Sequence, residues 1–156
     1  MTDLRSALDD SEFIDALLNL VIPPSVDGTL PGAGTLGLAP AMAAALRADK
    51  LLGPLVEVGV EAVRATALSE HPEGLPAMTP QGGTELLKAQ LSAHPVLIMG
   101  ILRHLCPAYY QQPQVLEAIG DQPRPPFPDG YAVEPTDAEL LEKLRGRRTV
   151  WCLVDG

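Results

Sequence analysis

The sequence predicts an all-α protein, an irregular bundle of five to seven helices with a long C-terminal arm rich in proline and glycine. Apolar residues recur at helical spacing through most of the first 120 residues. Hydrophobic residues make up 46% of the 156 residues but aromatic ones only 4%, so the core must be aliphatic. Sixteen prolines and fourteen glycines divide the pattern into short segments. We therefore expect a helical bundle over 1–120, and over 121–156 an extended arm with a terminal helix, in the same domain.

The charge of the chain argues against two classes of partner. Eleven Lys and Arg against twenty Asp and Glu give a net charge of −9, whereas nucleic acids and anionic membranes attract clustered positive charge.

No apolar stretch approaches the roughly 18 residues that cross a bilayer, so we expect no direct membrane insertion. The N-terminus lacks a secretory or twin-arginine pattern. We expect a cytoplasmic protein with reduced Cys106 and Cys152, or a periplasmic one if a leader was removed.

The N-terminal helices follow from apolar spacing and from proline positions. Apolar residues between Leu4 and Val21 predict one helix, or two helices with a break, and Pro23-Pro24 ends it. Asp9 and Glu12 have the spacing of a capping box. Pro40 suits the first turn of the next helix.

A third helix is expected over residues 54–68. Its inward face would hold Val56, Val60, Val63 and Ala67. Glu57, Glu61 and Arg64 would form the opposite, charged face.

The later helices are set by capping residues and by a strongly apolar run. Thr79 is expected to cap a helix in which Leu87 and Leu91 point inward. The segment 95–110 is apolar all round, which predicts a buried, central helix. Pro107 is expected to kink or end it.

The run from Gly32 to Gly37 matches the dinucleotide fingerprint G-x-G-x-x-G letter for letter. That fingerprint binds a pyrophosphate only between a strand and a helix. Here a helix ending at Pro23 precedes it, so the sequence favours a glycine-rich loop that enters a helix.

Candidate chemistry is sparse along the chain. His94, His104 and Cys106 do not have the spacing of a zinc site, and His104 is expected to be a hydrogen-bonded core histidine. No nucleophile elbow or triad context surrounds the serines. The sequence therefore predicts no catalytic, cofactor-binding or metal-binding residue in this chain.

Most aromatic residues gather between Tyr109 and Tyr131, interleaved with prolines. Tyrosine and proline on a pre-extended arm lose little entropy on docking, which suits an interface with a second protein. Alternatively, the arm wraps its own domain and Tyr109 and Tyr110 pack beneath it. The sequence alone leaves both interpretations open.

Several of these segments together resemble the gluconate 2-dehydrogenase subunit 3 family. They are the helix ending Leu20-Val21-Ile22-Pro23-Pro24, the following Pro31-Gly32-Ala33, Tyr109-Tyr110 with Pro113 and Val115, Ile119-Gly120, and the proline-rich run ending Gly130-Tyr131. The resemblance spans roughly residues 11–131.

The resemblance implies a small, helical, non-catalytic subunit. It would bind and stabilise a large FAD-dependent dehydrogenase of the glucose-methanol-choline type, with the FAD in that partner and in some complexes a cytochrome subunit as well. The positions implied as structural or interface residues are Tyr109, Tyr110, Pro113, Gly120, Pro125, Gly130 and Tyr131, and the aromatic clustering adds Phe127.

Two other functions stay open at the level of sequence. One is a free-standing helical enzyme or ligand-binding domain that uses the loop at 28–37. The other is a self-sufficient scaffold or homo-oligomer.

Overall fold

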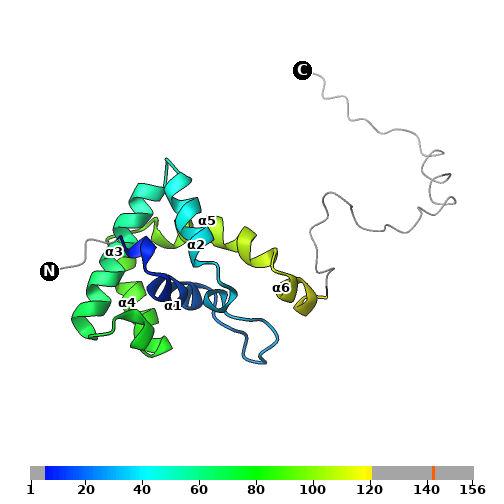
Figure 1. Ribbon diagram of the computed structural model, residues 1–156, viewed down its shortest axis with the longest axis horizontal. Coiled ribbons are helices and arrows are strands. Elements are labelled where there is room, and N and C mark those ends of the chain that lie inside the picture. The colour runs from blue at the N-terminus through cyan, green and yellow to red at the C-terminus, as the bar shows by residue number, and fades with distance from the viewer. Residues whose placement is uncertain (1–5, 121–141, 143–156) are drawn as a thin grey trace, which may run out of the picture. The chain divides into compact units, whose positions relative to one another are not determined.

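The computed structural model describes residues 6–120 and residue 142, and these residues confirm the all-α prediction (Figure 1). They contain six α-helices, three short 3-10 helices and no strand. The α-helices are α1 (Ser11–Val21), α2 (Ala39–Ala48), α3 (Gly53–Glu70), α4 (Pro80–Leu91), α5 (Leu97–Tyr110) and α6 (Pro113–Ala118). The 3-10 helices are η1 (Ala7–Asp9), η2 (Ala33–Leu36) and η3 (Leu75–Ala77).

The chain separates into two units, Met1–Arg124 and Pro125–Gly156. The six helices belong to the first unit. The arm and terminal helix predicted over 121–156 lie outside the described residues, apart from Glu142, which is helical.

Helix α3 packs one face against several other helices of the bundle. Its inward residues are those predicted from the sequence, Val56, Val60, Val63 and Ala67, and each is 0% exposed. Helices α2, α4 and α5 all pack against α3. Burying one such aliphatic side chain contributes about 1.5–3 kcal/mol, so this seam is a main source of stability.

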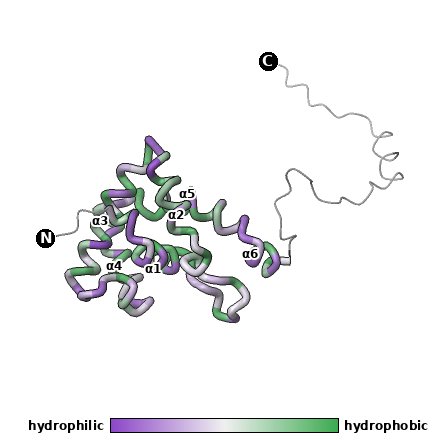
Figure 2. The backbone as a smooth tube through the Cα atoms, viewed as in Figure 1, coloured by the Kyte–Doolittle hydropathy of each residue, from purple (hydrophilic) through white to green (hydrophobic). Residues whose placement is uncertain are grey.

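The rest of the core is also aliphatic. Hydrophobic and hydrophilic residues alternate along the helices in Figure 2, as an amphipathic bundle requires. Leu17 and Leu18 of α1, Met42 of α2 and Ile101 of α5 are all at most 2% exposed. Among the described residues, no charged side chain lies in this core.

The N-terminal segment is two helices with a break, and the capping residue differs from the predicted one. Asp10, and not Asp9, caps α1, because its Oδ1 accepts a hydrogen bond from the Phe13 amide at 3.1 Å. Asp9 still belongs to η1 and pairs instead with Arg47 of α2, at 2.6 Å. The break falls one residue later than the capping-box spacing predicts.

Helix α5 continues through Pro107 to Tyr110, so of the two predicted effects of this proline the ending of the helix is wrong. It is also not buried all round, since Met99 is 67% exposed while Leu97 is 0% exposed. Apolar composition therefore overstated its burial: one face packs on the bundle and the other faces solvent.

Two glycines allow neighbouring helices to approach α3 closely. A Cβ on Gly100 of α5 would collide with the Cγ2 of Val56, and a Cβ on Gly53 would collide with the Leu46 carbonyl oxygen of α2. Gly53 is the first residue of α3 and opens this helix directly against α2. Larger residues at either position would push the helices apart.

No helix in the described part of the chain combines the length and the hydropathy that a membrane-spanning segment requires.

We expect Gly100→Ala to lower the free energy of unfolding by about 1–3 kcal/mol, because the added methyl group overpacks the contact with Val56. Urea denaturation followed by circular dichroism measures this change. In a Val56→Ala background the same substitution should cost much less, since the colliding methyl group is absent. Equal costs in the two backgrounds would contradict the close α3–α5 contact.

Candidate functional site

The two adjacent tyrosines at the end of α5 have different environments. Tyr109 is 2% exposed, and its hydroxyl donates a hydrogen bond to the Pro31 carbonyl at 2.8 Å. Burial raises the pKa of Tyr109 above its usual value near 10. Tyr109 thus packs within its own bundle and fastens α5 to the chain at Pro31. The arm that the second interpretation places over both tyrosines lies outside the described residues.

Tyr110 points outward and is 52% exposed. Its ring lies edge-to-face on that of Tyr109, with centroids 5.2 Å apart and an interplanar angle of 89°. This contact fixes one side of the Tyr110 ring, so less conformational entropy is lost when the other side binds.

Helix α6 follows directly and ends with another exposed apolar residue. Pro113 opens the helix, Ile119 is 50% exposed, and Gly120 takes φ +79° immediately after it. Pro113 and Gly120 are both exposed. The remaining predicted interface residues, Pro125, Phe127, Gly130 and Tyr131, lie outside the described residues.

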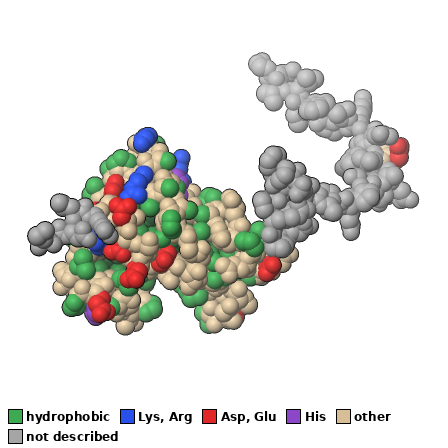
Figure 3. Space-filling model, viewed as in Figure 1, with side chains coloured by type: hydrophobic (Ala, Val, Ile, Leu, Met, Phe, Trp, Pro, Cys, Tyr) green, Lys and Arg blue, Asp and Glu red, His purple; other side chains and the backbone are tan. Residues whose placement is uncertain are grey.

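Further exposed apolar residues lie on α3 and in the turn before it, where sequence reasoning missed them. Leu51, Leu55 and Val58 are 75%, 54% and 59% exposed. Hydrophobic side chains also reach the surface between acidic ones on the face shown in Figure 3. The sequence feature that could have revealed them is their spacing of four and then three residues, which places them on one face of a helix. The charged residues of the same segment obscured this pattern.

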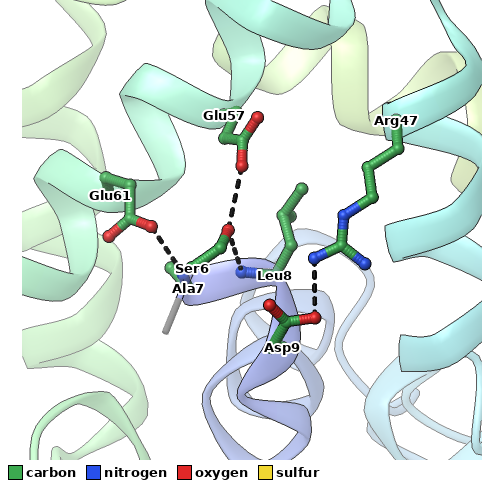
Figure 4. Close-up of polar contacts among 7 residues, drawn as sticks. All are labelled: Ser6, Ala7, Leu8, Asp9, Arg47, Glu57 and Glu61. Carbon is green, nitrogen blue, oxygen red and sulfur yellow. Dashed lines mark hydrogen bonds and ion pairs between the residues drawn. The ribbon is translucent and has the colours of Figure 1, made fainter. Parts of the chain in front are cut away.

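The charged residues of α3 lie on its flank and not opposite its buried face, which corrects the prediction. Figure 4 shows Glu57 and Glu61 turned toward the N-terminal segment. Glu57 accepts a hydrogen bond from the Ser6 hydroxyl at 2.9 Å, and Glu61 accepts one from the Ala7 amide at 2.5 Å. These acids hold η1 against α3 and leave its outermost face to the aliphatic residues.

The glycine-rich run is predicted to be a loop that enters a helix, but four of its residues, Ala33–Leu36, form the 3-10 helix η2. The Gly34 amide donates a hydrogen bond to Asn19 Oδ1 of α1 at 2.9 Å. A side chain at Gly34 would collide with the Asp15 carbonyl oxygen, so glycine is required for this close contact. The Gly34 amide is therefore already engaged by α1.

Asp49 connects three helices. Its Oδ1 accepts hydrogen bonds from the Leu51 and Leu52 amides, both at 3.0 Å, at the start of α3. Its Oδ2 lies 3.1 Å from His104 Nε2 and 3.8 Å from Arg103 Nε, both on α5. The Leu52 amide, followed by His104, holds the pKa of Asp49 below its usual value. This geometry confirms that His104 is a hydrogen-bonded histidine, although it is only partly buried.

An apolar groove lies between α1 and the segment from η3 to α4. It has a volume of about 320 Å³ and is walled by prolines and aliphatic side chains. Two polar side chains line it: Asn19 Oδ1 accepts a hydrogen bond from the Gly34 amide, and the Thr79 hydroxyl accepts one from the Gly82 amide at 3.1 Å. Pro23 and Pro24 line it, but residues 28–37 do not.

Asp15 is the one described residue with a buried side-chain oxygen, Oδ1, that has no hydrogen-bond partner. Burial raises the pKa of Asp15 above its usual value. Within residues 6–120, no three His, Cys, Asp or Glu side chains are grouped so that they could hold a metal ion.

No protein-family model matches the chain, and no curated protein or solved structure is significantly similar to it.

Replacing Tyr109 with phenylalanine should lower the free energy of unfolding by about 1–2 kcal/mol, because the Pro31 carbonyl loses its buried donor. Tyr110→Phe is the matched control on the exposed ring, and we expect it to change stability by less than about 0.5 kcal/mol. Chemical denaturation of the two variants measures both. Equal effects would contradict the assignment of Tyr109 to the interior.

Because folding lowers the pKa of Asp49, the free energy of unfolding depends on pH in the acidic range. The stabilisation is fully present above the unfolded-state pKa of about 3.9 and is lost as the pH falls through the folded-state value. Asp49→Asn should therefore lower Tm at pH 6, and its difference from the wild type should shrink toward pH 2. Glu117→Gln, an exposed position on α6, controls for the change in net charge. A difference that stays constant with pH would contradict the role of the carboxylate.

Proposed function

We propose that this chain is a non-catalytic small subunit that binds and stabilises a FAD-dependent sugar or gluconate dehydrogenase of the glucose-methanol-choline type. The flavin would be held by the larger subunit, and a cytochrome could complete the complex. The partner class rests on the resemblance between residues 11 and 131 to the gluconate 2-dehydrogenase subunit 3 family. We also propose a cytoplasmic location.

The observation that carries the proposal is the exposed apolar end formed by α5 and α6. Tyr110 is half-exposed, and its ring is already positioned by the buried Tyr109. Ile119 is exposed to the same degree at the end of α6, just before the arm begins. Tyrosine is among the residue types enriched at the energetic centre of protein–protein interfaces.

The alternative of a ligand-binding domain built on residues 28–37 gains no support from this geometry. The Gly34 amide is bonded to α1, and the apolar groove is lined by residues outside 28–37. We therefore propose no second function.

Co-expression with a flavin dehydrogenase of this type tests the proposal. We expect the two chains to copurify with bound FAD, and Tyr110→Ala or Ile119→Ala to weaken the complex about 10- to 100-fold. Isothermal titration calorimetry measures the affinity, and unchanged Tm values of the free variants would exclude an effect on folding.

Met99→Ala is the matched control, because Met99 is an exposed apolar residue near the other end of α5. We expect it to leave the affinity unchanged. A dehydrogenase that is equally soluble, flavin-loaded and active without this chain would overturn the proposal.

A further inference from the structure

Charged residues are nearly absent from two stretches of the sequence. Residues 16–46 contain one, Asp27, and residues 105–120 contain one, Glu117. Charged residues make up 20% of the chain as a whole. Outside these two stretches, residues 6–120 carry ten Asp and Glu against five Lys and Arg. The charge of the described chain is therefore concentrated on the rest of the bundle, and it is predominantly acidic.

The fold brings the two stretches together at one end of the bundle. The Tyr109 hydroxyl donates its hydrogen bond to the Pro31 carbonyl, which joins the last turn of α5 to the segment between α1 and η2. We call residues 23–37 and 109–120 the low-charge end. Figure 3 shows charged side chains mainly on the left, over α2, α3 and α4, and few of them on the right, toward α6. Segments far apart in the sequence thus contribute to one region of the surface.

Three large hydrophobic side chains of the low-charge end face solvent. Val26 is 109% exposed, and Tyr110 and Ile119 are each about half-exposed. A fully exposed valine contributes nothing to the core of its own chain. Burial of Val26 would therefore come only from a second molecule.

The loop that carries Val26 is closed by its own hydrogen bonds. Asp27 Oδ1 accepts from the Ser25 hydroxyl at 2.6 Å, from the Thr29 amide at 3.1 Å and from the Thr29 hydroxyl at 2.9 Å. The Ser25 amide donates to the Leu30 carbonyl at 3.0 Å. The only charge of this loop is therefore used within it, and a loop ordered in this way loses less entropy on binding.

We infer that the large subunit of the proposed complex covers the low-charge end, with Val26 of the loop 25–30 as a second anchor in addition to Tyr110. This inference rests on the proposed function and names the part of the chain that the partner contacts. The centre of a stable interface is depleted of charged residues and enriched in tyrosine, because a buried charge loses its hydration. The low-charge end combines both properties.

The charge distribution also specifies the chemistry of the partner. Since the described surface around the low-charge end is acidic, a complementary partner presents an apolar patch bordered by Lys and Arg. A second copy of this chain does not fit that description, because each copy has a net charge of −9 and the two would repel. Attraction between unlike charges speeds association and is screened by salt. We therefore expect the association rate constant of the complex to fall about tenfold between roughly 50 and 500 mM NaCl.

Binding of the FAD-dependent dehydrogenase to two matched variants tests the contact. Val26→Asp and Val58→Asp place the same charge on exposed valines, the first at the low-charge end and the second on α3. We expect Val26→Asp to raise the dissociation constant about 10- to 100-fold, and Val58→Asp to leave it unchanged. Both variants should keep the wild-type Tm, because neither side chain is buried. Isothermal titration calorimetry measures the affinities.

The outcomes separate this inference from the proposed function. If Tyr110→Ala weakens the complex while Val26→Asp binds like Val58→Asp, the contact at the loop 25–30 is wrong and the proposed function stands. A wild-type chain that forms no complex with the dehydrogenase would overturn both. An association rate constant that does not change with salt would contradict the border of Lys and Arg on the partner.

Hydrogen–deuterium exchange of the wild-type complex is a second measurement, and it needs no substitution. Amides of the loop 25–30 should exchange more slowly in the complex than in the free chain. The turn at 49–52, between α2 and α3, is the control and should keep its exchange rate. Equal exchange of the loop 25–30 in the free and the bound chain would overturn the inference.

Discussion

The close approach of α2 and α5 to α3 is the constraint on which the bundle depends. The inner face of α3 is made of valine and alanine, so neighbouring backbones must come near for the core to fill. Gly53 and Gly100 permit that approach where a side chain would collide with α2 or with Val56. The buried valine and alanine residues occupy only one side of α3, so the other sides of the helix are available for other contacts. Its acidic flank holds the N-terminal segment, and its aliphatic outer face stays in solvent.

Helix α5 connects this core to the surface that we assign to a partner. Near its middle, His104 and Arg103 face Asp49 at the junction of α2 and α3. At its end, Tyr109 bonds to the Pro31 carbonyl and supports the ring of Tyr110. The exposed tyrosine is therefore held by an internal framework, and a preorganised side chain of this kind binds at a lower entropic cost than a free one. The proposed accessory role depends on that framework and on the family resemblance together.

Most of the helices could be predicted from the sequence, because apolar periodicity and proline positions act locally. The inward residues of α3 and the cap at Thr79 followed from such rules. Exposure could not be predicted in the same way. Leu91 is only partly buried whereas Leu86 is 5% exposed, and Met99 faces solvent in an apolar helix, because burial depends on which neighbours arrive. Of the candidate site, the sequence located Tyr109 and Tyr110 but could not assign one to the interior and the other to the surface. The sequence-based prediction also missed the aliphatic outer face of α3, because it placed Glu57 and Glu61 on that face and not on the flank.

Pro107 lies between the two tertiary attachments of α5, with His104 on one side and Tyr109 on the other. Bending stiffness in a helix is lowest where a proline interrupts the hydrogen-bond ladder. The half of α5 before the proline is anchored to Asp49, while the last turn is anchored by the core packing of Tyr109 and by its hydrogen bond to the Pro31 carbonyl. The position of Pro31 therefore bears on the last turn of the helix and on the direction of the Tyr110 ring that lies against Tyr109.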